Sequence, residues 1–198
     1  MPKIVDHNAV RESIVQNAVT VFASKGYHST NIIDIAEKTG LSRTTIYQYY
    51  KNKDQIFFQV VELIVDLLRR ELRTLQEDKE LPRIEKMKKT IRKILETFDK
   101  NQELAIILIE IRMMFNKENC HLLTKQIMIY LSELHDLFIY NIDKAIKRGE
   151  IKHLDSRTAA YMLILLLESY LLDCGLEEKI PIDIFIHNIE IIIDSLIK

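Results

Sequence analysis

Residues 30–53 read TNIIDIAEKTGLSRTTIYQYYKNK, and this stretch decides how the N-terminal part of the chain folds. Its first half has the apolar spacing of one short helix, with Ile32, Ile35 and Ala36 on one side. Gly40 follows and can take the left-handed conformation that turns a chain after a helix. Ser42 is a favourable N-cap, so a second short helix is expected from Arg43 to about Tyr50. The stretch therefore predicts two helices joined by a tight turn.

The second of these helices has a surface that stability alone does not explain. Ile46 is the residue that faces inward at helical spacing. The other positions carry hydroxyl, amide, guanidinium and phenol groups: Arg43, Thr44, Thr45, Tyr47, Gln48 and Tyr49. A surface helix crowded with hydrogen-bonding side chains is suited to lie against a nucleic acid.

The segment before this stretch predicts a third helix of the same bundle. It runs from Asp6 or Asn8 to about Ser24, and its apolar residues recur at helical spacing. Gly26 then ends the helix. Three helices on so little chain form a small bundle, which we expect to be a helix-turn-helix domain over residues 1–52.

The remaining residues, 53–198, are expected to form a larger helical domain. The chain contains only 4 Gly and 3 Pro, so helix breakers are few. Asn52 can cap a long helix that reaches about Glu77. Further helices are expected at about 82–100, 104–115, 121–148, 155–174 and 182–198. The sequence thus predicts an all-α protein of about nine helices.

Charge and composition bound the partners of this chain. The net charge is -1, yet residues 1–53 carry +3 and the remainder -4. A mildly basic N-terminal part fits a small contact surface for nucleic acid, although chance unevenness is the alternative. Two distant cysteines indicate no disulfide framework, which favours a reducing cytoplasm. We expect no signal peptide and no membrane partner, because no apolar run is long enough to span a bilayer.

The last two expected helices are apolar over more than one face. They contain the runs MLILLLESYLL and IFIHNIEIIIDSLI. A helix that is apolar all round is buried on both sides, and a second copy of the chain can supply the second cover. We therefore expect a symmetric homodimer with an interface at Leu163, Leu167, Tyr170, Ile189 and Ile193. Two core helices of a monomer are the alternative.

One motif of the sequence is found in a class of enzymes. Glu118 and His121 have the Glu-x-x-His spacing of di-iron helical bundles, but such bundles need a second pair and two more glutamates. No second pair exists, and glycine-rich phosphate loops, nucleophile motifs and zinc spacings are absent from the sequence. We expect no catalytic residues, no metal and no cofactor, and we keep a helical-bundle enzyme only as an alternative.

The N-terminal residues resemble the TetR family of bacterial transcriptional regulators. The resemblance rests on an apolar helix ending in Phe22 and followed by Lys25-Gly26-Tyr27, and on later matches that continue the pattern. These matches are Thr30, Ile35-Ala36, Gly40-Leu41-Ser42, Thr45-Ile46-Tyr47 and Asn52-Lys53. The family fold that this implies is a DNA-binding domain followed by a helical domain for ligand binding and dimerisation.

The resemblance implies a homodimer that binds a palindromic operator, with the helix from Arg43 in the major groove. Carried over residue by residue, the DNA-binding positions are Thr30, Ser42, Arg43, Thr44, Thr45, Tyr47, Gln48, Tyr49 and Lys53. Tyr47 and Tyr49 would reach the backbone, and Lys53 would clamp a phosphate. Thr44 replaces a frequent Gly of the family. Ile33 replaces a common polar residue and can meet a thymine methyl group.

The C-terminal part is weakly similar to members of the family that respond to fatty acids or long-chain acyl-CoA. That similarity implies a repressor released by a small apolar or acyl-CoA-like ligand, held among the fourth to eighth helices. The candidate ligand-binding residues are Arg112, Met113, Tyr130, Leu134, Phe138, Tyr161 and Glu168, each of which has ordinary core packing or ion pairing as its alternative. A TetR-like DNA-binding or interaction protein without an inducer is the alternative function.

Overall fold

The computed structural model describes residues 6–78, 80–114, 121–174 and 179–197. Within these ranges the chain forms nine helices, and its only β-type pairing is an isolated bridge between Ile151 and Ile197. The helices are α1 (His7–Lys25), α2 (Ile32–Thr39), α3 (Arg43–Tyr49), α4 (Lys53–Glu77), α5 (Arg83–Lys100), α6 (Gln102–Met114), α7 (His121–Lys147), α8 (Ser156–Asp173) and α9 (Ile182–Asp194). The predicted all-α fold class is confirmed.

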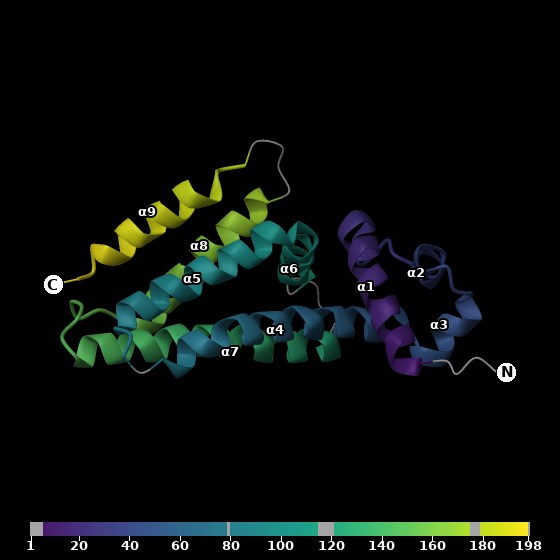
Figure 1. Ribbon diagram of the computed structural model, residues 1–198, viewed down its shortest axis with the longest axis horizontal. Coiled ribbons are helices and arrows are strands. Elements are labelled where there is room, and N and C mark those ends of the chain that lie inside the picture. The colour runs from purple at the N-terminus through teal and green to yellow at the C-terminus, as the bar shows by residue number, and fades with distance from the viewer. Residues whose placement is uncertain (1–5, 79, 115–120, 175–178, 198) are drawn as a thin grey trace.

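The helices form an elongated molecule with α1, α2 and α3 at one end (Figure 1). Helix α4 leaves this end and runs along the larger helical part. Helix α5 lies inside that part and packs against α4, α6, α7, α8 and α9. Helix α1 packs on α2, α4 and α6, so two helices of the larger part hold the N-terminal bundle. Among the described residues, no helix is long and apolar enough to span a membrane.

Helix ends follow the capping residues that the sequence predicts. The Asp6 carboxylate accepts hydrogen bonds from the amides of Asn8 and Ala9 at 3.0 and 3.2 Å, so α1 is capped by Asp6. Gly26 ends α1 with a φ of 77°, a conformation that side chains with a Cβ rarely adopt. At the start of α4, the Asn52 side chain accepts from the amide of Gln55 at 3.0 Å.

The far end of α4 is held by a buried lysine on α5. Lys86 is only 1% exposed, and its ammonium donates to the carbonyls of Gln76 and Asp78 at 3.1 and 2.6 Å. The first carbonyl lies in the last turn of α4 and the second directly follows the helix, where unpaired acceptors and the helix dipole favour a cation. Burial lowers the pKa of Lys86 from its ordinary value. The lysine thus ties the end of α4 to α5.

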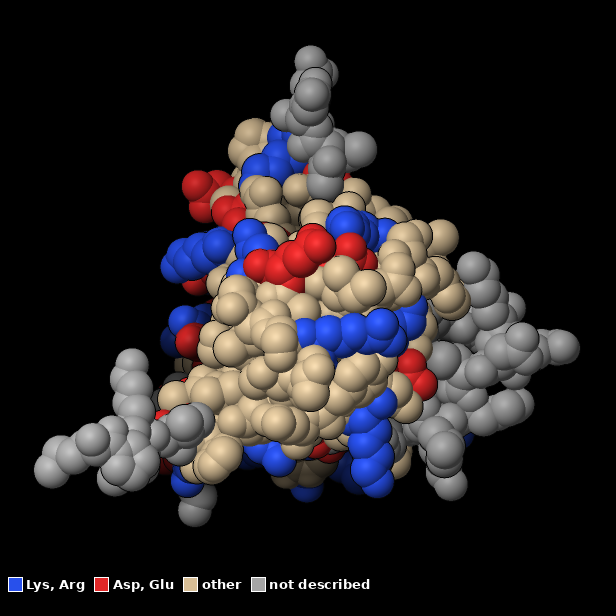
Figure 2. Space-filling view, turned by 90° about the vertical axis from the view of Figure 1, so that its right-hand side faces the viewer, with Lys and Arg blue, Asp and Glu red and all other residues tan. Residues whose placement is uncertain are grey.

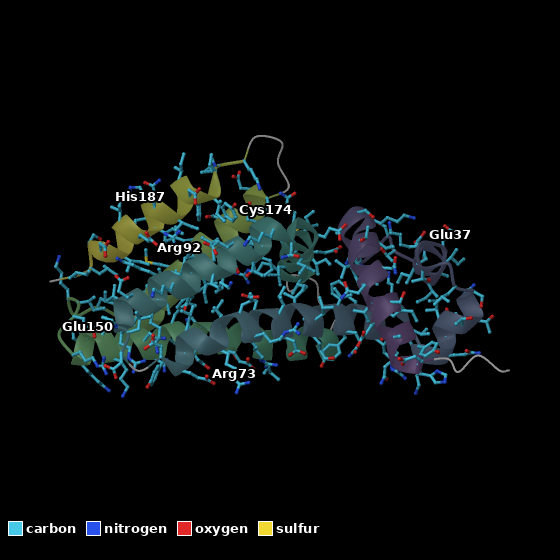
Figure 3. The ribbon with its side chains drawn as sticks, in the orientation of Figure 1. Glu37, Arg73, Arg92, Glu150, Cys174 and His187 are labelled. Carbon is cyan, nitrogen blue, oxygen red and sulfur yellow. The ribbon has the colours of Figure 1, made fainter. Side chains whose placement is uncertain are left out.

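Helix α9 closes the larger part over α5. The Arg92 guanidinium on α5 faces α9 and lies 2.7 Å from the Glu190 carboxylate (Figure 3). Near the other end of α9, the rings of Tyr170 and Phe185 lie 4.9 Å apart and join α8 to α9. Both contacts are within one chain, so α9 is part of the protomer's own core.

The structure corrects which residues of α8 and α9 face outward. The five residues predicted at a dimer interface are buried in the single chain, at 0–6% exposure: Leu163, Leu167, Tyr170, Ile189 and Ile193. They fill the face that packs on α5 and its neighbours. The opposite faces are also apolar, and their exposed residues are Tyr161, Met162, Leu165 and Leu172 on α8 and Ile184, Ile191 and Ile192 on α9. The helices are therefore apolar on two faces, as the sequence indicated, but the outward set is a different one.

Candidate nucleic-acid interface

The turn between α2 and α3 is built as the sequence predicts. Gly40 has a φ of 71° and a ψ of 15°, the left-handed conformation, and Leu41 donates to the carbonyl of Ala36 at 3.1 Å. The Ser42 hydroxyl accepts from the amide of Thr45 at 3.0 Å and caps α3. A cap of this kind stabilises a helix by about 1 kcal/mol. The turn and the cap together fix the direction in which α3 leaves α2.

Helix α3 fully buries Ile46 and presents several of its other side chains. Ile46 is fully buried, whereas Arg43, Thr44 and Gln48 are exposed and Tyr47 is 43% exposed. The Arg43 guanidinium donates to the Tyr47 hydroxyl at 3.3 Å and lies 5.4 Å from the centre of its ring. This pairing holds a cation and a phenol side by side on the outer face of the helix. Such a face can offer several donors to phosphates and base edges at once.

A surface hollow adjoins this face. It has a volume of about 420 Å³ and lies between the N-terminal ends of α2, α3 and α4, and it is lined by Asn31, Ile32, Ile33, Asp34, Arg43, Tyr47, Lys51, Asn52 and Lys53. Figure 2 looks onto this end of the molecule and shows Lys and Arg scattered over a largely uncharged face. Glu37 on α2 points away from the helical bundle at the same end (Figure 3). The end is therefore not a strongly basic patch, and contact there depends on a few placed side chains.

Two predicted contact residues are turned inward. Thr30 is fully buried, and its hydroxyl donates to the carbonyl of Gly26 at 2.7 Å. Tyr49 is half-buried against α1, where its hydroxyl lies 2.9 Å from Nδ1 of His7 and its ring lies 5.7 Å from the Arg11 guanidinium. The Thr30 hydroxyl therefore already serves the fold, and a role of Thr30 in DNA binding stays a prediction.

Lys53 also has a different place from the one predicted. Its ammonium donates to three backbone carbonyls, those of Tyr27 at 2.6 Å, His28 at 3.0 Å and Thr30 at 2.9 Å. An ammonium has three N–H donors, so these carbonyls match its full capacity. The side chain thus joins α4 to the segment between α1 and α2. Lys53 therefore has a structural role in this chain, and the phosphate clamp at Lys53 stays a prediction.

Sequence reasoning passed over Lys51 as a contact residue. Lys51 is exposed and lines the hollow together with Arg43 and Tyr47. Its signal in the sequence was its position directly before the Asn52 cap, at the positive end of α4. Lys51 is therefore a better candidate than Lys53 for a phosphate contact.

The predicted ligand-binding residues do not converge on one cavity. Arg112 on α6 and Glu168 on α8 come together as an ion pair at 3.3 Å. Phe138 is fully buried, whereas Met113 and Tyr161 are exposed. Leu134 lines an open apolar hollow of about 430 Å³ between α4 and α7. The side chain of Tyr130 lies outside the described residues.

The described residues hold no group of three or more His, Cys, Asp or Glu side chains that could bind a metal ion. Glu118 and the side chain of His121 lie outside the described residues.

Comparison with known proteins gives the same interpretation for the helix-turn-helix end of the molecule. Residues 14–60 match the family model described as "Bacterial regulatory proteins, tetR family". The HTH-type transcriptional regulator HbdR of Aromatoleum sp. (strain CIB) is 34% identical over 71 residues, which are 36% of this chain and 30% of that protein. The chain covers about a third of the length of the curated relatives it matches. These relatives are named as transcriptional regulators, in agreement with the expectation that the chain is not an enzyme.

The whole chain shares its fold with solved regulators. FadR of Bacillus subtilis, solved with stearoyl-CoA, superposes with a TM-score of 0.78 at 23% identity, over 94% of this chain and 99% of that one. AibR, solved with isovaleryl coenzyme A and operator DNA, superposes with a TM-score of 0.79 at 14% identity, over 91% of this chain and 95% of that one. At these identities the likeness shows the fold alone.

Proposed function

We propose that this chain, whose N-terminal helices belong to the TetR family of bacterial regulatory proteins, is a transcriptional repressor that binds operator DNA. The observation that carries the proposal is the outer face of α3, where a capped helix buries Ile46 and presents Arg43, Thr44 and Gln48. In this proposal residues 1–52 bind DNA, residues 53–198 bind ligand and a second copy, and the chain acts in the cytoplasm.

The operator in this proposal is a palindrome, and the protein binds it as a homodimer. A short recognition helix reads few bases, and a two-fold dimer doubles the contact by placing two helices about 34 Å apart, one turn of DNA. The exposed apolar faces of α8 and α9 support a dimer, because each carries several large apolar side chains in helical succession. Contiguous apolar surface of this kind is a common mark of an interface.

The effector in this proposal is an amphiphile with an apolar chain and an anionic head, such as a long-chain acyl-CoA. The hollow between α4 and α7 supports this class. Its walls include Val65, Leu68, Leu72, Leu134 and Leu137, and its rim includes Arg69 and Arg73. Leucine and valine walls suit an acyl chain. The rim arginines are paired with Glu133 and Glu77, so an anionic head would bind there by exchanging these carboxylates for its own.

The proposal is tested by selecting bound sequences from a random pool of double-stranded DNA, with and without stearoyl-CoA. The expected result is an enriched palindrome whose recovery falls when stearoyl-CoA is present. A pool with no enriched sequence would contradict DNA-specific regulation. Equal enrichment under both conditions would contradict the proposed effector and favour a TetR-like DNA-binding protein that has no such inducer.

A further inference from the structure

The segment between α1 and α2, residues 26–30, is held by two different helices of the larger part. We call this segment the α1–α2 junction. It leads directly into α2, which in turn carries α3 through the Gly40 turn. A displacement of the α1–α2 junction would therefore move α2 and α3, which carry the face proposed to bind DNA.

Helix α4 holds the junction from one side. Its first residue, Lys53, donates to three junction carbonyls, and the Lys53 ammonium also lies 4.6 Å from the centre of the Tyr27 ring. Its second residue, Asp54, accepts a hydrogen bond from the Tyr27 hydroxyl at 2.5 Å. The Phe57 ring on the next turn lies 4.8 Å from the Tyr27 ring. The N-terminal end of α4 and Tyr27 thus form one packed unit.

Helix α6 holds the same residue from the other side. The Glu110 carboxylate accepts a hydrogen bond from the backbone amide of Tyr27 through Oε1. A Cβ added at Gly26 would lie 2.9 Å from that oxygen, so the glycine leaves room for the carboxylate to approach the backbone. The second oxygen of Glu110, Oε2, is buried and has no hydrogen-bond partner among the described residues. The contact is therefore made through one oxygen only.

Tyr27 connects two helices of the larger part, α4 and α6. Its amide is bound by Glu110 on α6, while its carbonyl and hydroxyl are bound by Lys53 and Asp54 on α4. A shift of α6 against α4 must stretch one set of these bonds or move Tyr27. The turn of α6 that carries Glu110 also carries Arg112, which pairs with Glu168 on α8. A change at the α6–α8 contact can therefore reach the junction through less than one turn of helix.

We propose that Glu110 is the positioning residue that couples α6 to the DNA-binding helices by holding the backbone of Tyr27. This inference rests on the proposed function, because it assigns the path by which an effector changes DNA affinity. An effector can act through this path only if it binds the two positions of α6 with different affinity. The coupling is then a property of the Glu110–Tyr27 bond and not of general packing.

Amide hydrogen exchange tests the bond without DNA or effector. In Glu110→Ala, the peptide covering residues 23–31 should exchange faster at Tyr27 by about tenfold, because a hydrogen bond to a charged acceptor is lost. Glu110→Gln keeps an oxygen that can accept from the same amide and keeps the side-chain volume, so it should restore part of the protection. Glu103→Gln is the matched control, since Glu103 on α6 also contacts α1, through the Thr20 hydroxyl at 3.1 Å.

The role in coupling is tested by the ratio of operator dissociation constants with and without stearoyl-CoA. A typical allosteric ratio is about 5- to 150-fold, and in Glu110→Ala it should fall below about twofold. Glu103→Gln should keep the wild-type ratio. Tyr27→Phe removes only the bond to Asp54, so it should loosen α4 and leave the amide of Tyr27 protected by Glu110.

The outcomes separate this inference from the proposed function. If the Tyr27 amide exchanges at the wild-type rate in Glu110→Ala, the hydrogen bond between Glu110 and Tyr27 is contradicted. If it exchanges faster but the ratio of operator dissociation constants stays at the wild-type value, the role of this bond in coupling is contradicted. A wild-type chain without any response to stearoyl-CoA contradicts the proposed effector class instead. In that case the coupling is tested with operator DNA alone. Because coupling between two sites is reciprocal, DNA binding should change amide exchange across α6 in the wild type and should leave it unchanged in Glu110→Ala. The same change in both proteins would contradict the coupling.

Discussion

Two lysines that stand two positions apart have different surroundings and should affect DNA binding differently. The Lys53 ammonium is bound by three backbone carbonyls, whereas Lys51 is exposed beside Arg43 and Tyr47. A lysine contributes to the salt dependence of DNA binding when it neutralises a phosphate and releases a counterion. Of these two lysines, Lys51 is the one whose ammonium makes no hydrogen bond to a backbone carbonyl among the described residues.

Replacing each lysine by alanine should therefore give two distinct results. Lys51→Ala should weaken binding at all sequences and reduce the slope of log K against log salt by about 1. Lys53→Ala should weaken binding by loosening the junction while leaving the slope unchanged. Fluorescence anisotropy titrations at several salt concentrations measure both. A reduced slope for Lys53→Ala would return that residue to the phosphate-binding set.

Ile33 gives a prediction about base recognition. It is 49% exposed and lines the hollow beside Arg43 and Tyr47, where an apolar side chain can meet a thymine methyl group. Replacing one operator thymine by deoxyuracil removes that methyl alone and should cost about 0.8 kcal/mol, roughly fourfold in affinity. In Ile33→Ala the same DNA change should have little effect. The measurement is the affinity lost when each operator thymine is replaced in turn by deoxyuracil. If the loss at every thymine is the same for the wild type and Ile33→Ala, the contact is contradicted.

For single residues, the sequence was informative where a residue shapes or caps the backbone next to it in the chain. Gly40, Ser42 and Asn52 are recognisable because a left-handed turn or a cap needs particular residue types at particular places. The partners of Thr30 and Lys53 were not recognisable, since both bond to carbonyls of a segment whose path depends on tertiary packing. A lysine at a helix N-terminus looks the same in the sequence whether its ammonium faces solvent or the backbone.

Single contacts also decide how whole helices are joined. Asp99, near the end of α5, accepts hydrogen bonds from the Tyr170 hydroxyl on α8 at 2.8 Å and from the Lys179 ammonium at 2.6 Å, shortly before α9. The Lys179 ammonium and the Tyr170 hydroxyl lower the pKa of the Asp99 carboxyl below its ordinary value of 3.8. One carboxylate thus links three elements of the larger part.

This link predicts a dependence of stability on pH. The unfolded carboxyl binds a proton more readily than the folded one, so acid favours unfolding. The contribution of Asp99 is present above its ordinary pKa of 3.8 and is lost as the pH falls through the lower pKa of the folded state. Asp99→Asn should cost about 1 kcal/mol at pH 7, a value reduced for partial exposure, and progressively less below pH 4. Thermal unfolding from pH 7 to pH 3 measures this, and a constant difference would contradict it.

For the elements, helical periodicity predicted existence and order well, because long amphipathic segments with few glycines have few alternatives. It predicted less about the outward faces of α8 and α9. Both helices are apolar on two sides, and a sequence pattern does not say which side packs on α5. The predicted effector residues failed to converge for a related reason, since a cavity depends on how helices are spaced and not on which residues each helix carries.

For the molecule as a whole, the exposed apolar faces of α8 and α9 predict how the dimer should respond to substitution. Leu165→Glu and Ile191→Glu each place a charge on an exposed apolar face, at residues that are 40% and 52% exposed in one chain. If these faces meet a second copy, the double variant should be a folded monomer, because an unpaired charge is costly inside an interface. Ile189→Glu is the contrasting variant: Ile189 is 3% exposed, so the protomer itself should be destabilised.

Sedimentation and circular dichroism together distinguish these outcomes. The double variant should lose dimer mass and keep its helical signal, whereas Ile189→Glu should lose helical signal at a lower temperature. Intact dimers of the double variant would place the interface elsewhere. Loss of helix in the double variant would show that these faces serve the fold of one chain.

The bond between Lys86 and the C-terminal carbonyls of α4 has a mechanical consequence. It fixes one end of a helix of 25 residues, while the other end, at Lys53, is fastened to the α1–α2 junction. A helix of that length measures about 37 Å, so a pivot of about 5° at Lys86 displaces Lys53 by about 3 Å. This distance is close to the rise of one base pair, about 3.4 Å. A small change in the angle of α4 at Lys86 is therefore enlarged, at the α1–α2 junction, to a displacement comparable in size to one base-pair step.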